Sequence, residues 1–285
     1  MNDTKIILIL LLLGGFLIRS VGLSTVPPAL NSDELLKAFD GASVYRTGMD
    51  HHGHAWPLFF QQSGEYSPSL YIYFAGFFST PFGINPYTVR LPSAILGTLS
   101  ILMTFLFVHS FRDRKTALVA AALVTISPWD VHYSRIGWEA ISLVPLQLGA
   151  LWMFVRWSKT FCVKNLLLSV SFFGLTIYAY PVARLSSILF MSGLMILYWR
   201  TLIQHKIHVI WGIAVFVLWI IPYFLILYLN YDDMQARWRF VSLFNRDDAL
   251  LVFIQQYFMH LSLGFLFLWG NPGAIHSLLG GLALG

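Results

Sequence analysis

The amino-acid sequence predicts an all-α integral membrane protein that crosses the bilayer several times. Of its 285 residues, 57% are hydrophobic and only 11% are charged, and the mean hydropathy is +0.69. Soluble domains carry about 25% charged residues, so a water-soluble fold could not bury this much apolar surface. The apolar residues form long runs between short polar turns, which is typical of membrane-spanning helices.

Seven apolar runs are the predicted spans. They cover residues 6–18, 93–110, 116–129, 140–155, 165–180, 185–199 and 209–229. No clear small-x-small cleavage site follows the first run, so we expect a retained helix rather than a signal peptide. Several runs are shorter than the roughly 20 residues of an isolated span, and 116–129 is the weakest. We keep that run because the charge pattern requires it.

Three basic turns predict the orientation of these spans. They lie at residues 111–115, 156–164 and 199–208 and alternate with loops that hold most of the acids. Because basic loops stay in the cytoplasm, we expect the N-terminus inside. The prediction is one transmembrane domain over residues 1–285, with a first extracytoplasmic loop at 24–92 and a later extracytoplasmic segment at 230–270.

The remaining composition excludes other classes. The net charge is +5, but the basic residues separate apolar runs and form no stripe, so no nucleic-acid partner is expected. Cys162 is the only cysteine, which excludes a disulfide within the chain. The first outer loop contains a predicted amphipathic helix at 33–46 and an aromatic stretch at 66–81 that suits a membrane surface. Residues 276–285 begin another apolar stretch, and we expect further helices beyond it.

An adjacent pair of acids, Asp33 and Glu34, follows directly on the first span. A carboxylate at this depth can act as a general base on an acceptor hydroxyl or as a metal ligand. The alternative is a helix start, in which Ser32 or Asp33 caps the helix and Glu34 complements its dipole. The spacing alone leaves both readings open.

A second polar cluster packs one acid and three imidazoles into residues 50–54. Carboxylate and neutral imidazole together form a plausible set for a divalent metal, with His51 and His54 as its ligands. The alternative is a polar turn that ends at Gly53, because adjacent ligands converge on one ion less readily than ligands spaced i, i+4.

Two arginines join predicted spans at the outer surface. Arg135 precedes Glu139, and Arg184 follows Tyr178 and Tyr180. An arginine at this interface can clamp a phosphate through two parallel hydrogen bonds. An ion pair or an interfacial anchor is the alternative for each of them.

Taken in order, these motifs resemble one family. The resemblance rests on Asp33-Glu34, residues 45–50 with Gly53, residues 57–60 and 89–97, Ser127-Pro128-Trp129 with Ser134, Arg135 and Glu139, and finally Tyr178, Tyr180 and Arg184. The set is similar to bacterial membrane glycosyltransferases of the protein O-mannosyltransferase and aminoarabinose transferase superfamily, the family 39-like enzymes with the GT-C fold.

The resemblance implies a GT-C helical bundle that transfers a sugar from a polyprenyl-phosphate donor to a lipid, glycan or protein acceptor. It places this reaction on the extracytoplasmic face of a prokaryotic plasma membrane. It also implies that Asp33 is the catalytic acid, with Glu34 beside it, and that a divalent metal is variable. The expected substrate-binding residues are Asp50, Arg90, Arg135, Glu139, Tyr180 and Arg184.

Two alternatives come from other classes of protein. A transporter or flippase for a lipid-linked substrate would share the aromatic spans and the outer basic residues. An ion-coupled transporter, however, places ionisable residues near the bilayer midplane, where these spans have almost none. A structural subunit of an envelope complex would need no ordered set of acids and arginines.

Overall fold

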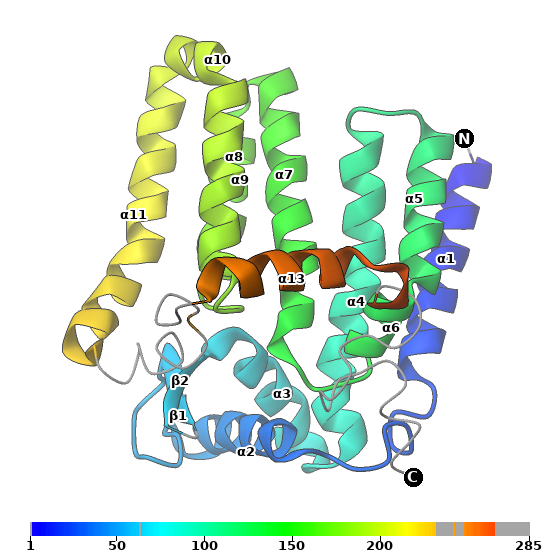
Figure 1. Cartoon of the computed structure of the whole chain (residues 1–285), viewed down its shortest axis with the longest axis vertical. Coiled ribbons are helices and arrows are strands. Elements are labelled where there is room, and N and C mark those ends of the chain that lie inside the picture. The colour runs from blue at the N-terminus through cyan, green and yellow to red at the C-terminus, as the bar shows by residue number, and fades with distance from the viewer. Residues whose placement is uncertain (1, 63, 232–241, 243–247, 266–285) are drawn as a thin grey trace.

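The computed structural model describes residues 2–62, 64–231, 242 and 248–265 (Figure 1). Its elements in chain order are α1 (Asn2–Ser20), α2 (Ser32–Thr47), β1 (Phe59–Gln62), β2 (Glu65–Pro68), α3 (Ser69–Phe82), α4 (Pro86–His109), α5 (Arg114–Ile126), α6 (Pro128–Tyr133), the 3₁₀ helix η1 (Glu139–Ser142), α7 (Leu143–Thr160), α8 (Val163–Thr176), α9 (Ala183–Leu197), α10 (Trp199–Gln204), α11 (Lys206–Leu229) and α13 (Ala249–Leu261). The predicted all-α class is confirmed, with one short β-hairpin that the sequence did not predict.

The long helices form an upright bundle, with α2, α3 and the β-hairpin at one end (Figure 1). Each predicted apolar run has its counterpart in one helix of this bundle. Three helical segments are long and apolar enough to cross a membrane, namely Pro86–His109, Glu139–Thr160 and Lys206–Leu229, and the shorter apolar helices include α8 and α9. The bundle is therefore that of a multi-pass membrane protein.

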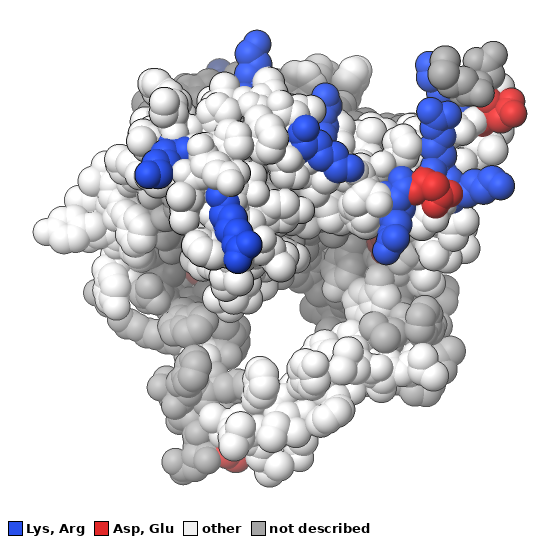
Figure 2. Space-filling view, turned by 90° about the horizontal axis from the view of Figure 1, so that it is seen from above, with Lys and Arg blue, Asp and Glu red and all other residues white. Residues whose placement is uncertain are grey.

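The two ends of the bundle differ in character. The turns after α4 and α7 and the short helix α10 lie at the end that carries the N-terminus, which we call the basic end (Figure 1). Figure 2 looks onto this end and shows its Lys and Arg side chains spread across the surface with few acids. The alternation predicted from the charges is present, and the side of the membrane that each end faces stays a prediction.

The opposite end carries α2, α3 and the β-hairpin, and we call it the loop end (Figure 1). The helix predicted at 33–46 is present as α2, but it buries Lys37 and Asp40 and exposes Leu35, so it lacks the expected apolar face. Its cap is neither Ser32 nor Asp33. Asn31 caps it by accepting a hydrogen bond from the Glu34 N–H at 2.7 Å, and the Glu34 carboxylate accepts one from the Asn31 N–H at 3.1 Å. This reciprocal capping box fixes where α2 begins.

The helices α2 and α3 touch backbone to backbone. A Cβ atom built on Gly76 would lie 2.3 Å from the carbonyl carbon of Gly41, so neither position has room for a side chain. A buried cluster that includes Ala38, Tyr71 and Val89 then packs these helices against α4. The loop end is thereby held firmly on the bundle.

The later segment predicted at 230–270 is only partly described. Its residues 232–241, 243–247 and 266–270 lie outside the described residues, as does the apolar stretch 276–285. Within the described part, α13 runs crosswise to the bundle helices in the view of Figure 1.

Candidate functional site

The paired acids at the start of α2 have opposite environments. Glu34 is only 2% exposed and accepts hydrogen bonds from Arg90 Nε at 2.8 Å, Arg90 Nη2 at 3.0 Å and the Gly137 N–H at 2.6 Å. Burial raises the pKa of Glu34, but Arg90 and the N–H groups of Gly137 and Asn31 outweigh it, so the pKa lies below its ordinary value. Asp33 is exposed, and its carboxylate has no hydrogen bond or ion pair within the described chain.

Arg90 is fully buried and holds the segment between α1 and α2. Besides its two bonds to Glu34, it donates to the carbonyls of Leu23 at 3.1 Å, Pro27 at 2.7 Å and Ala29 at 2.6 Å. A guanidinium has five N–H donors, and these five bonds use all of them. The geometry gives Arg90 a structural role in place of the substrate contact predicted for it.

Arg135 is likewise bound to the protein. It donates to the carbonyls of Ile18 at 2.8 Å and Arg19 at 3.3 Å, at the end of α1, and to that of Val26 at 3.1 Å. Arg184 instead lies against Tyr223 of α11, and α1 and α11 stand on opposite sides of the bundle (Figure 1). The two arginines therefore lie on opposite sides of the bundle.

Arg184 has buried donors that no described residue uses. Its guanidinium carbon lies 5.4 Å from the ring centre of Phe59 and 4.7 Å from that of Tyr223. Its Nε and Nη2 atoms are buried and have no hydrogen-bond partner in the described part of the chain. A buried cation without a matching anion is costly, so this group is suited to bind an anionic ligand.

Glu139 pairs with a lysine that the sequence analysis missed. Lys37 Nζ lies 2.5 Å from the Glu139 carboxylate and 5.6 Å from the ring centre of Trp138, and both charged side chains are buried. Lys37 follows Asp33 by four residues on α2, so the two side chains share one helix face. That spacing was the available signal, and it places Asp33 one helical turn from Lys37.

Trp138 also lines a cavity of about 390 Å³ at the loop end. Its walls include Trp129, Asp130, Tyr133 and Tyr180, and the rings of Trp129 and Tyr133 are stacked with centres 5.6 Å apart. Asp130 faces the Arg19 guanidinium at 2.5 Å, and burial raises its pKa beyond what Arg19 offsets. The cavity thus combines flat aromatic walls with a carboxyl group, and Tyr180 is the predicted site residue that it includes.

The histidine-rich turn is built around two aspartates. Asp50 accepts hydrogen bonds from the N–H groups of His52 at 2.9 Å and His54 at 2.8 Å, and its carboxylate faces the His54 imidazole. Gly53 adopts a φ of 85°, so the segment has the geometry of a polar turn. These contacts show that Asp50 shapes the turn, and a contact of Asp50 with substrate stays a prediction.

The predicted metal ligands do not converge. His51 Nδ1 bonds to Asp40, whose other carboxylate oxygen accepts a hydrogen bond from Gln62 at 2.6 Å, whereas His54 faces Asp50. Among the described residues, no three His, Cys, Asp or Glu side chains are arranged to hold a metal ion. A divalent metal therefore stays a prediction, and we route no step through it.

The helical bundle, with α2, α3 and the β-hairpin at one end, is that of a polytopic membrane protein of the GT-C type. Residues 67–226 match the family described as dolichyl-phosphate-mannose-protein mannosyltransferase, which is more than half of the chain. The chain therefore belongs to this family of membrane glycosyltransferases. This membership favours the enzyme over the transporter and the structural subunit.

Two solved structures share the fold. One is the archaeal oligosaccharyltransferase AglB from Archaeoglobus fulgidus in complex with an inhibitory peptide and a dolichol-phosphate, with a TM-score of 0.60 and 16% identity over 93% of this chain and 37% of that chain. The other is the Archaeoglobus fulgidus oligosaccharyltransferase in the apo form, with a TM-score of 0.59 and 18% identity over 99% of this chain and 39% of that chain. The chain thus spans less than two fifths of either structure. No curated protein sequence matches it.

Proposed function

We propose that this protein transfers a sugar from a polyprenyl-phosphate donor to an acceptor hydroxyl at the loop end, on the extracytoplasmic face of the plasma membrane. Family membership supports the lipid-phosphate donor. The observation that carries the proposal is the Arg184 guanidinium, whose buried Nε and Nη2 atoms have no partner among the described residues.

The donor phosphate occupies the unpaired side of Arg184. A planar guanidinium binds two phosphate oxygens at once, and the rings of Phe59 and Tyr223 hold it in place through cation–π contacts. Arg184 is the second residue of α9, so the phosphate lies where an apolar span begins and the polyprenyl tail can lie along the spans.

The sugar lies in the aromatic cavity of the loop end. Tyr180 lines that cavity and precedes Arg184 by four residues, which connects the cavity to the phosphate site. Ligand pockets are mostly apolar with a few placed polar groups, and stacked Trp129 and Tyr133 beside Asp130 fit this description. Such walls suit a sugar ring, which has apolar faces and hydroxyl edges.

Asp33 is the general base. Its free carboxylate accepts the proton of the acceptor hydroxyl while that oxygen forms a bond to the anomeric carbon of the sugar. The bond between this carbon and the phosphate oxygen breaks, and the leaving phosphate is stabilised by Arg184. A single displacement with one carboxylate inverts the anomeric centre. Glu34 and Arg90 are positioning residues, because they fix the first turn of α2.

The test compares two aspartates that Asn can replace at little structural cost. Asp33→Asn leaves the Asn31 cap of α2 intact, so it is expected to insert and bind donor normally, with turnover lowered by about 10²–10⁴-fold. The matched control is Asp113→Asn at the exposed N-cap of α5, where Asn and Asp are equivalent and turnover is expected to stay unchanged.

Both variants are assayed in membranes for release of polyprenyl phosphate from polyprenyl-phosphate mannose. Arg184→Gln is assayed beside them and is expected to lose donor binding, because Gln has no charge to offer the phosphate. Full turnover by Asp33→Asn removes the proposed base. Unchanged donor affinity in Arg184→Gln removes the proposed phosphate site.

A further inference from the structure

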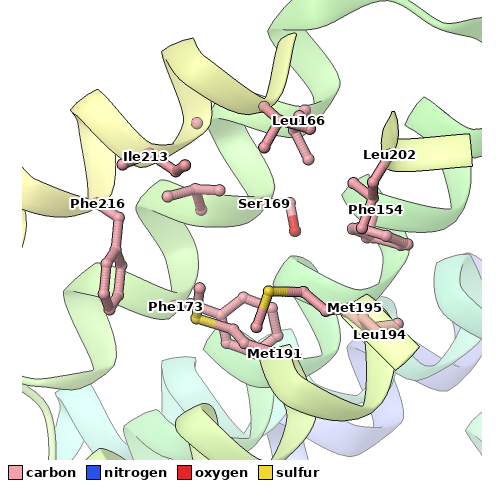
Figure 3. Close-up of a pocket in the computed structure, with 13 residues that line it drawn as sticks. Phe154, Leu166, Ser169, Phe173, Met191, Leu194, Met195, Leu202, Ile213 and Phe216 are labelled. Carbon is pink, nitrogen blue, oxygen red and sulfur yellow. The ribbon is translucent and has the colours of Figure 1, made fainter. Parts of the chain in front are cut away.

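A second cavity lies among α7, α8, α9, α10 and α11, toward the basic end of the bundle (Figure 3). Its volume is about 260 Å³, and the side chains that enclose it, such as Phe173, Met191 and Leu202, are almost entirely carbon and sulfur. A dry apolar cavity of about 150 Å³ is already enough for a benzene-sized ligand. The function proposed above does not use this cavity.

Water has nothing to bind in this cavity. Ser169 is its polar side chain, and the Ser169 hydroxyl already donates to the carbonyl of Ala150 at 2.7 Å. Met195 and Ile213, which are 53% and 57% exposed, form a rim between α9 and α11 that is open to the lipid around the bundle. The occupant of such a space is a hydrocarbon chain, because an empty cavity would forfeit the dispersion contacts of its walls.

The helix α11 packs loosely against the bundle beside this cavity. Among its residues, Gly212 alone is buried, and Gly212 faces the cavity. In a bilayer, helices associate through van der Waals packing rather than through the hydrophobic effect, so a loosely packed helix gains from an ordered chain beside it.

Exposed basic residues lie at the basic end of the helices that wall the cavity. Lys164 precedes the wall residue Leu166 by two positions, Arg200 precedes Leu202 by two, and Lys206 opens α11 three residues before Val209. These residues belong to the turns that gather at this end of the bundle (Figures 1 and 2). A lipid whose chain enters the cavity would therefore present its head group to cations.

We propose that this cavity binds one acyl chain of an anionic phospholipid from the leaflet at the basic end, with its phosphate among Lys164, Arg200 and Lys206. This site is distinct from the donor site. Arg184 lies at the loop end, and α11 alone separates the two ends by roughly 36 Å at 1.5 Å per residue. The bound phospholipid fills the space between α8 and α11 and stabilises their packing.

A side chain at Gly212 tests the cavity. A Cβ atom there would lie 3.7 Å from Leu166 Cδ2 and Val170 Cγ2, which is ordinary contact, so Gly212→Leu starts without a clash and extends into the cavity. Gly193 of α9 is the matched control, because a Cβ atom built on it meets nothing within 4 Å. Leucine at either site leaves the charge unchanged.

The measurement is native mass spectrometry of the purified chain with added phosphatidylglycerol or phosphatidylcholine. Wild type and Gly193→Leu are expected to retain one phosphatidylglycerol, and Gly212→Leu is expected to lose it. The separate Arg200→Gln and Lys206→Gln variants keep the cavity and are expected to lower the affinity for phosphatidylglycerol about fivefold each.

Equal retention by Gly212→Leu overturns the proposal, and so does binding of phosphatidylcholine as tight as that of phosphatidylglycerol. If Gly212→Leu does not fold, the two charge variants decide the question alone. Displacement of phosphatidylglycerol by one equivalent of polyprenyl phosphate would assign the cavity to the donor tail instead. None of these readouts involves sugar transfer, so the result stands or falls independently of the proposed enzymatic activity.

Discussion

Replacing Arg90 by Met is expected to release the loop end from the bundle while the spans stay inserted. The change leaves the Glu34 carboxylate buried without its cation, and the carbonyl of fully buried Leu23 loses a donor. Removing one partner of a buried ion pair costs about 3–5 kcal/mol, and an unsatisfied buried carbonyl adds about 1 kcal/mol or more. A loss of about 4–6 kcal/mol approaches the whole stability of many domains.

The assay is limited proteolysis of the segment between α1 and α2, together with thermal unfolding of the detergent-purified protein. The double variant Arg90→Met/Glu34→Met removes both charges at similar volume and is expected to recover most of the loss, because apolar replacements of a buried pair are often neutral. Arg112→Met, at an exposed position of the basic end, is the control. Wild-type stability of Arg90→Met would refute the reasoning, as would a double variant no more stable than the single one.

Three further predictions follow from the same geometry. The folded-state pKa of Glu34 is lowered, so the contribution of Glu34 to stability is present above its unfolded pKa of about 4.3 and is lost as the pH falls through the folded value. Between about pH 6 and about pH 3, the unfolding temperature should therefore fall more steeply for wild type than for Glu34→Gln. Parallel curves for the two proteins would contradict this. Gly76→Ala forces α2 and α3 apart and should lower the free energy of unfolding by about 1–3 kcal/mol, whereas Gly193→Ala should leave it unchanged. Equal stability of the two variants in thermal unfolding would argue against the close crossing of α2 and α3. A membrane-impermeant thiol reagent should reach Cys162 and a cysteine in Cys162→Ser/His52→Cys from opposite sides of the membrane; labelling of both from one side would overturn the topology.

The bundle was predictable because a lipid solvent narrows the choices. Every backbone polar group within the hydrocarbon must be satisfied internally, so a long apolar run can hardly be anything but a helix. The weak run at 116–129 has its counterpart in α5, a helix of 13 residues, and its crossing of the membrane stays a prediction. The sequence did not predict the β-hairpin because its strands, Phe59–Gln62 and Glu65–Pro68, have four residues each, too few for an alternating apolar pattern to be recognised.

The site was less predictable because its side chains have partners far away in the sequence. Asp33 and Glu34 are neighbours with the same functional group, and what tells them apart are the partners of Glu34, such as Arg90, 56 positions away. Nothing in the sequence singled out Lys37, because its ion-pair partner Glu139 is far away along the chain. Arg135 was predicted to bind a phosphate because its actual partners are backbone carbonyls, which every residue has and which a sequence therefore does not reveal.

The arrangement of charges at the loop end separates structural residues from functional ones. Arg19 is fully buried and bonded to Asp130 and to the carbonyls of Val124 and Thr125, and Arg90 is saturated in the same way. These paired residues have no reason to bind a ligand, because their hydrogen-bond donors and acceptors are already satisfied within the protein. Asp33 and Arg184 stand apart, since one is a carboxylate with no partner in the described chain and the other a half-buried guanidinium whose buried Nε and Nη2 atoms have none. A reaction that takes a proton from a hydroxyl and releases a phosphate needs one group of each kind. The saturated pairs hold the loop end in place so that these two groups can remain open.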